Sequence, residues 1–162
     1  MGCDIHCIIE YKHKTINGDR WDSFGYTSFT PGRDYSWFAN LAGVRGEPKG
    51  GVALASGFGI PEDASFTTRM ESSYFVQDTN SVDIKSMLDS GTVKWIDWAK
   101  DLQGKPTRVT HPDWHTYGWC DVKAWKKSLR GKDNLYIKCM NAIIDTLAKN
   151  KCKVRVVFWF DN

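Results

Sequence analysis

The chain has no long hydrophobic run. No stretch of its 162 residues reaches the roughly 20 apolar residues that a membrane-spanning helix needs, and no basic leader precedes an apolar segment at the amino terminus. These absences predict a cytoplasmic protein with no membrane partner.

A dense cluster of basic residues is also missing. The formal net charge is only +3, and lysines and arginines do not gather along any one segment. This distribution argues against an extended nucleic acid as partner, because a phosphate backbone is bound by a basic stripe. A small anionic ligand remains compatible with the charge.

The five cysteines follow no familiar spacing. Their number is odd, and neither a CxxC nor a zinc-finger pattern is present. We therefore expect reduced thiols in an intracellular protein rather than a disulfide framework. The glycines between positions 50 and 59 match neither a Walker loop nor a Rossmann fingerprint, so two common nucleotide-binding motifs are absent.

Aromatic side chains, in contrast, are abundant. They make up 14% of the chain and include eight tryptophans, within a hydrophobic content of 41%. A chain of 162 residues buries one substantial core, so we expect a single domain, residues 1–162. Rings of this kind build cores, and they also provide surfaces on which ligands stack.

The amino-terminal segment has the alternation of a strand. One predicted face carries the apolar side chains of Cys3, Ile5, Cys7, Ile9 and Tyr11. The other face carries Asp4, His6, Ile8 and Glu10. One face therefore suits a core, and the other suits chemistry.

Turn and cap signals follow this strand. Asn17-Gly18 predicts a tight hairpin with a return strand within 21–30. Asp34 is placed to cap a helix that ends near Gly43. The glycine- and proline-rich segment 46–61 is long for a connection in a compact domain and predicts a mobile loop.

The second half of the chain alternates helical and strand patterns. Asp83 and Asp121 each precede a helical turn, and Asp133 is predicted to cap the longest helix. Its predicted apolar stripe comprises Leu135, Tyr136, Met140, Ile143, Ile144 and Leu147. Residues 154–160 predict a buried strand. The pattern indicates an α+β fold, a single sheet of mainly antiparallel strands that includes both chain ends, with helices packed on one face.

Three groups of residues suggest chemistry, and the first is Asp4, His6 and Glu10. Carboxylate and imidazole groups spaced by two on a strand suit acid–base catalysis, and Asp4 with His6 suits a divalent ion such as magnesium, manganese or zinc. No other cofactor is expected. The Asp-x-His opening is similar to that of calcineurin-like metallophosphoesterases, although their Gly-Asn-His motif is missing. The alternative is a polar face that simply meets water.

The second group lies within 111–119, before a predicted helix. His115 is the favoured catalytic residue there, and Trp114, Thr116 and Trp119 are candidate ligand contacts, because loops before helices offer free N–H groups to phosphate. The alternative is that these rings fill the core. The third group is Arg33, Tyr35 and Arg45, where a guanidinium fork suits phosphate or carboxylate. Arginines of this kind more often form surface ion pairs.

Several segments resemble a family of small bacteriophage proteins. The similarity covers the opening Met-Gly-Cys-Asp-Ile-His, the segments 32–45 and 113–119, and the ending Phe-Trp-Phe-Asp-Asn. The family often has His-Ser-x-Ser-Trp where this chain has His115-Thr116-Tyr117-Gly118-Trp119. This resemblance implies a phage protein acting inside an infected bacterium, and it implies no established activity.

These observations lead to one principal hypothesis. We expect Asp4, His6, Glu10, Arg33 and His115 to converge on a pocket walled by tryptophans that binds a small phosphorylated or nucleotide-derived ligand. Such a protein would sequester or cleave a host immune-signalling nucleotide, and cleavage would make it a phosphodiesterase or another hydrolase.

In the enzyme version of this hypothesis, His6 or His115 acts as acid or base, and Asp4 or Glu10 orients the imidazole or holds a metal. The alternatives are a metal-dependent phosphoesterase and an interaction module that inhibits a host protein through aromatic anchors. Oligomerisation stays open.

Overall fold

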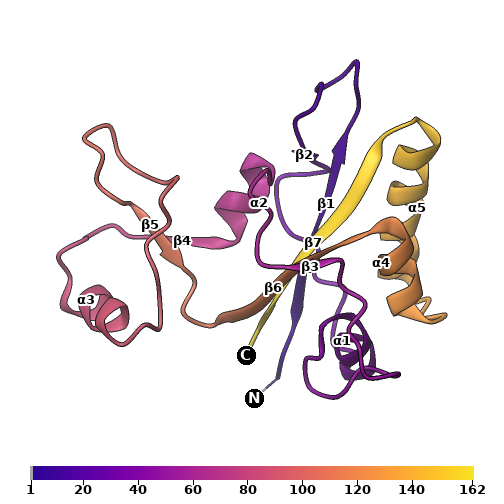
Figure 1. Ribbon diagram of the computed structural model, residues 1–162, viewed down its shortest axis with the longest axis horizontal. Helices are drawn as coiled ribbons and strands as arrows, with labels where there is room; N and C mark the ends of the chain where they lie inside the picture. The colour runs from indigo at the N-terminus through magenta and orange to yellow at the C-terminus, as the bar shows by residue number, and fades with distance from the viewer. Residues whose placement is uncertain (1) are drawn as a thin grey trace.

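The computed structural model describes residues 2–162 and contains a five-stranded antiparallel sheet at its centre (Figure 1). Its strands are β1 (Ile5–Lys12), β2 (Asp22–Ser23), β3 (Gly57–Phe58), β6 (Trp114–Asp121) and β7 (Lys153–Asp161), in the order β2-β1-β7-β6-β3. The strands nearest the two chain ends, β1 and β7, are central neighbours that pair along their whole length. The predicted α+β fold with an antiparallel sheet that includes both chain ends is confirmed.

Three helices pack on one face of this sheet. They are α1 (Tyr35–Ala42), α4 (Val122–Leu129) and α5 (Leu135–Lys149). Their buried side chains meet the apolar face of β1 in one core, as the alternation of its first residues predicts. The largest fully buried members of that core include Trp37, Trp125, Phe38, Phe158 and Phe160.

The predicted caps are partly right. Asp34 and Asp121 cap α1 and α4 by accepting the backbone N–H three residues on, and Gly43 ends α1 at φ 70°. The longest helix, however, is capped by Asn134 and not by Asp133. Asn134 accepts the backbone N–H of Ile137, so the helix begins one residue later than the Asp133 prediction placed it.

The predicted stripe of α5 is correct for Met140, Ile143, Ile144 and Leu147, which lie in the core or pack against it, and wrong for Leu135 and Tyr136. Leu135 is 77% exposed, whereas Ile137, Met140 and Ile144 are fully buried against the sheet. In the first turn of α5, Ile137 is therefore the residue that faces the core, while half-exposed Tyr136 lies at its margin with its ring edge-on to Phe29 at 6.1 Å.

A second, smaller layer lies at the opposite side of the main sheet (Figure 1). It comprises α2 (Phe66–Glu71), β4 (Ser73–Phe75), α3 (Val82–Asp89) and β5 (Arg108–Thr110). β4 and β5 form a two-stranded sheet over a small cluster of Val76, Val93 and Val109. The cap of α3 is Ser81, and Asp83 lies in its first turn instead of capping it. The prediction of one domain over 1–162 stays a prediction.

Segment 46–61 is tied to the main sheet in its second half. The N–H groups of Leu54 and Ala55 donate to carbonyls of α1, and Ser56 and Gly59 donate to carbonyls of β6. The mobility expected of 46–61 stays a prediction. Among the described residues, no helix has the length and apolar character needed to cross a membrane.

Candidate functional site

The two termini lie near each other at one end of the main sheet (Figure 1). Asp161, the last residue of β7, contacts His6 of β1 and the preceding Asp4. Its Oδ2 lies 2.9 Å from Nε2 of His6, and its Oδ1 accepts a 2.8 Å bond from the backbone N–H of Asp4. Both side chains stay partly accessible, at 17% for His6 and 27% for Asp161. Asp161 therefore orients the imidazole without sealing it from solvent.

A second charged pair lies beside this one. Arg33 donates to both carboxylate oxygens of Asp4, from Nε at 2.7 Å and from Nη2 at 2.8 Å. The hydrogen bond and charge of Arg33 lower the pKa of Asp4, and Asp4 raises the pKa of Arg33. The Arg33 side chain is 56% exposed, so part of its guanidinium stays accessible to a ligand. We refer to His6, Asp161, Asp4 and Arg33 as the His6 site.

Aromatic rings extend from the His6 site. His6 stacks on Trp159 with ring centroids 5.7 Å apart and lies 5.3 Å from the ring of Trp114. On the far side of Trp114, His111 stacks at 4.0 Å. Burial lowers the pKa of His111, which keeps this imidazole neutral at pH 7 and suited to stacking. We refer to His111, Trp114, His6 and Trp159 as the ring array.

Ser28 completes the polar surroundings of His6. Its Oγ lies 3.4 Å from Nδ1 of His6, on the nitrogen that Asp161 does not contact. The backbone N–H of Ser28 donates to Glu71 at 3.2 Å, which fixes the segment between β2 and α1 against α2. A hydroxyl, an imidazole and a carboxylate in this order form a proton-transfer chain.

A cavity of about 460 Å³ opens beside His111. Its floor is apolar and comes from the small second layer, with Val93, Val109 and Met87 among its residues. Asp78, Asp83 and Asp113 contribute carboxylates to the wall. The cavity therefore combines apolar contact with hydrogen-bond acceptors, next to the outer ring of the array.

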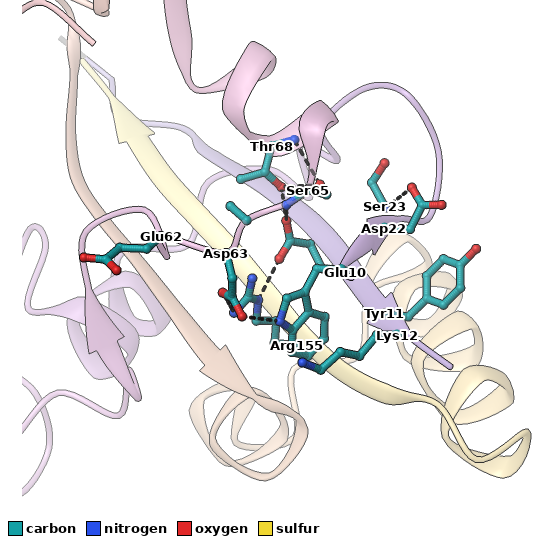
Figure 2. Close-up of polar contacts among 12 residues, drawn as sticks. Glu10, Tyr11, Lys12, Asp22, Ser23, Glu62, Asp63, Ser65, Thr68 and Arg155 are labelled. Carbon is teal, nitrogen blue, oxygen red and sulfur yellow. Dashed lines mark hydrogen bonds and ion pairs between the residues drawn. The ribbon is translucent and has the colours of Figure 1, made fainter. Parts of the chain in front are cut away.

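Glu10 lies outside this site. It is fully buried, and its carboxylate accepts bonds of 2.6 Å from Arg155, from the backbone N–H of Ser65 and from the hydroxyl of Thr68 (Figure 2). Arg155 also contacts Asp63 at 2.8 Å. These partners occupy the Glu10 carboxylate, so the structure does not bring Glu10 to His6.

His115 also lies apart from His6. Its ring stacks against the core residue Phe160 at 6.1 Å, on the opposite face of the sheet from Trp159 and His6. Nδ1 of His115 lies 2.9 Å from the hydroxyl of Thr116, and Nε2 is buried without a partner. Residues 114–119 belong to strand β6. The sequence pattern predicted a loop before a helix at these positions, and this prediction is wrong.

Thr116 marks an irregularity in that strand. The register of β6 against β7 shifts between His115 and Gly118, and Thr116 has φ 50°, a conformation uncommon for a residue with a Cβ. This bulge turns the side chains beyond it. Trp119 consequently lies beside Gly57 of β3, where a Cβ on Gly57 would come within 2.6 Å of its indole nitrogen.

The remaining predicted contacts surround the chain ends. The hydroxyl of Tyr35 accepts a 3.4 Å bond from the N–H of Cys3, and Arg45 donates to the side chain of Asn162 at 3.0 Å. Of the five residues expected in one pocket, the structure brings together Asp4, His6 and Arg33. It separates Glu10 and His115 from them.

Asp161 and Ser28 were missed by the sequence reasoning. A signal for Asp161 was present, because it lies two residues after Trp159 and alternation places both on one strand face. Ser28 carried no such signal, because its segment forms only a single bridge, between Phe29 and Cys7.

No three histidine, cysteine, aspartate or glutamate side chains within residues 2–162 form a group arranged to hold a metal ion. Asp4 is paired with Arg33, and His6 with Asp161. Metal binding by Asp4 and His6 stays a prediction.

Comparison with known proteins adds no assignment: no family model matches the chain, and neither the curated proteins nor the solved structures include a match. The functional argument therefore rests on the residues themselves.

Proposed function

We propose that the protein binds a small phosphorylated, nucleotide-like ligand across the ring array and the His6 site. The observation that carries this proposal is the series of partly exposed rings of His111, Trp114 and His6, which lies on the same strand face as Asp4 and its half-exposed partner Arg33. Flat rings stack on a nucleobase, and an arginine fork binds phosphate oxygens.

Charge gives the ligand an orientation. Asp78, Asp83 and Asp113 would repel a phosphate in the cavity beside His111, but carboxylates accept hydrogen bonds from ribose hydroxyls. The phosphate would instead lie toward Arg33 and His6. A cavity of about 460 Å³ falls within the range of small-molecule pockets and accommodates the nucleoside part.

A second candidate function is hydrolysis of that ligand, favoured by the arrangement of Ser28, His6 and Asp161. Nδ1 of His6 would take a proton from a water molecule positioned by Ser28. The water oxygen would bond to phosphorus, and the leaving oxygen would depart with a proton from solvent. Asp161 would stabilise the imidazolium that forms.

The resemblance to bacteriophage proteins makes host immune-signalling nucleotides the first ligands to test. Titration calorimetry against cyclic dinucleotides, cyclic mononucleotides and ADP-ribose derivatives should find at least one ligand. Chromatography after denaturation separates the two functions, because intact ligand indicates sequestration and products indicate hydrolysis. Hydrolysis that persists unchanged in His6→Ala would contradict the role given to His6.

Variants locate the binding surface. Stacking on an aromatic side chain contributes about 1–3 kcal/mol per base, so Trp114→Ala should weaken binding roughly tenfold or more while Trp114→Phe retains most of it. Arg20→Gln, an exposed arginine without an ion pair among the described residues, is the charge-matched control for Arg33→Gln. Unchanged affinity in Trp114→Ala would refute the proposed surface.

If none of the nucleotides tested by calorimetry binds, the result would instead support a protein interaction module. Large apolar side chains exposed to solvent favour that alternative; they include Tyr26, Phe58, Phe66, Tyr74, Phe75 and Trp98. A host protein captured by the parent and lost in Phe66→Ser and Phe75→Ser would identify such a module.

A further inference from the structure

Four lysines gather at the end of the main sheet opposite the two termini. Lys12 is the last residue of β1 and Lys14 follows it, while Lys151 precedes β7 and Lys153 is its first residue. These four residues, with Gly18 and Asp19, line a cleft of about 600 Å³. The two pairs are far apart in sequence, so no dense basic segment reveals them. We refer to this feature as the lysine cleft.

The pairing of β1 with β7 creates the cleft. Lys12 and Lys153 are directly opposite in the antiparallel register, two residues beyond the buried pair of Glu10 and Arg155. Like charges at directly opposed positions destabilise a sheet. The opposed positions of Lys12 and Lys153 therefore destabilise this end of the sheet.

The four ammonium groups outnumber the acidic side chains of the cleft, of which Asp19 is the one in the lining among residues 2–162. Within residues 2–162, none of the four lysines forms an ion pair, and Lys12 contacts only the backbone carbonyl of Asp19 and the ring of Trp21. Lys151 moreover adopts φ 61° in the turn before β7, where glycine would be unstrained. The cleft thus concentrates positive charge, and within residues 2–162 the ammonium groups of Lys14, Lys151 and Lys153 form neither hydrogen bonds nor ion pairs.

The chemistry of the lining indicates the ligand class. Lysine is a compact point charge that suits phosphate, and four of them match a group of adjacent phosphates. Among the described residues, the lining includes no aromatic side chain, and the nearby ring of Trp21 is covered by the ammonium group of Lys12, so the cleft offers a base no stacking surface. The volume of about 600 Å³ suits a small molecule rather than an extended strand.

We propose that the lysine cleft binds a small polyphosphate, a molecule with two or more adjacent phosphates that is recognised through those phosphates alone. The site is independent of the function proposed above. Lys12 lies six residues from His6 along β1, about 20 Å away at the rise of a strand.

Titration calorimetry with inorganic tripolyphosphate tests this proposal. The parent protein should bind it, with affinity that falls as salt rises from about 50 to about 200 mM, because screening weakens exposed charge interactions. Lys14→Gln with Lys153→Gln should weaken binding by about tenfold. Both side chains are exposed, so the double variant should fold, and far-ultraviolet circular dichroism verifies this.

The matched control is Lys94→Gln with Lys123→Gln, which removes the same charge from exposed positions outside the cleft. It should change the affinity by less than about twofold, because surface charges beyond a Debye length are screened. Equal losses in the two double variants would show a net-charge effect and overturn the site. Absence of binding by the parent would overturn it as well.

Two further ligands test the recognition of phosphates alone. A nucleoside triphosphate should bind the cleft with about the affinity of tripolyphosphate, since no ring contacts a base. Preference for the nucleoside triphosphate that is lost in Lys14→Gln with Lys153→Gln would contradict this recognition. Tight binding of duplex DNA without binding of tripolyphosphate would contradict the small-ligand assignment.

Discussion

Two acid–base pairs on the same face of β1 and β7 differ sharply in their surroundings. Glu10 and Arg155 are directly opposed in the sheet, and their side chains are 0% and 7% exposed. His6 and Asp161 lie four to six residues along the same strands and are 17% and 27% exposed. Two charged pairs on one face of the sheet thus differ in solvent access: Glu10 and Arg155 are buried, whereas His6 and Asp161 are partly exposed.

The difference comes from what covers each pair. The segment that leads into α2 closes over Glu10, where Ser65 and Thr68 donate to its carboxylate and Asp63 contacts Arg155 (Figure 2). His6 is bordered instead by the partly exposed ring of Trp114, by the buried ring of Trp159 and by Ser28. A buried pair whose Glu10 carboxylate is held by three donors specifies structure, whereas a partly exposed pair keeps protons and hydrogen bonds available for a ligand.

Breaking the sealed pair should have the largest effect. Glu10→Gln leaves Arg155 buried with a weakened partner, and breaking a buried pair costs about 3–5 kcal/mol. We expect the free energy of unfolding to fall by roughly 3 kcal/mol in urea denaturation. Glu62→Gln, at an exposed position on the same segment, should leave stability unchanged. A loss in Glu10→Gln as small as in Glu62→Gln would show that the pair is not structural.

Removing one hydroxyl from the cover should cost less. Thr68→Val keeps the side-chain shape but deletes the donor that lies 2.6 Å from Glu10. A hydrogen bond to a charged group contributes about 1.5–3 kcal/mol, so we expect a loss near 2 kcal/mol by the same measurement. Thr67→Val is the neighbouring control, because no side-chain hydrogen bond of Thr67 is present in the described part of the chain. Equal effects at both positions would contradict the role of the Thr68 hydroxyl.

The next position along the face should respond in the opposite direction. Lys153→Gln removes the like-charge contact with Lys12, and cross-strand pairs of this kind are each worth about 0.2–1 kcal/mol. We expect a gain of a few tenths of a kcal/mol at low salt that disappears at high salt. Thermal melts at two salt concentrations measure it. A loss of stability would show that Lys153 has a structural partner.

The open end should show the smallest change in stability and a clear change in titration. The hydrogen bond and charge of Arg33 lower the pKa of Asp4 below the ordinary 3.8. Arg33→Gln should therefore raise the pKa of Asp4. The stabilisation by the Asp4 carboxylate is complete above pH 3.8 and is lost as the pH falls through the lowered folded value. Carbon-detected NMR of the carboxyl group follows this titration. An unshifted pKa in Arg33→Gln would show that the pair does not form in solution.

Local patterns predicted several elements correctly. Alternation in the first nine residues placed Cys3, Ile5 and Cys7 in the core, and the apolar ending predicted a buried strand. Asp34 and Asp121 cap helices because capping depends on neighbours within one turn. The α5 stripe was right from Met140 onward but wrong in the first turn, where Ile137 is buried instead of Leu135, since the elements packed on a helix decide which of its apolar residues are covered.

The candidate site was predictable only in part. The spacing of Asp4 and His6 indicated the correct strand face, but their partners Arg33 and Asp161 are 29 and 155 residues from them in the chain. The bulge at Thr116 could not be derived from alternation, because one extra residue reverses the faces beyond it. His115 lies before the bulge and packs on the core side against Phe160; it was assigned to a pocket because residues 111–119 were interpreted as a loop before a helix.

The sequence by itself determined which side chains share a face of β1 and where α1 and α4 begin, because these properties depend on residues a few positions apart. The tertiary structure alone decided that Glu10 is sealed, that His6 is open and that two distant pairs of lysines share one cleft. Burial and charge clustering depend on which segments pack together, and long-range register sets that packing. On this face of β1 and β7, the buried pair of Glu10 and Arg155 therefore lies between two accessible ends, the His6 site and the lysine cleft.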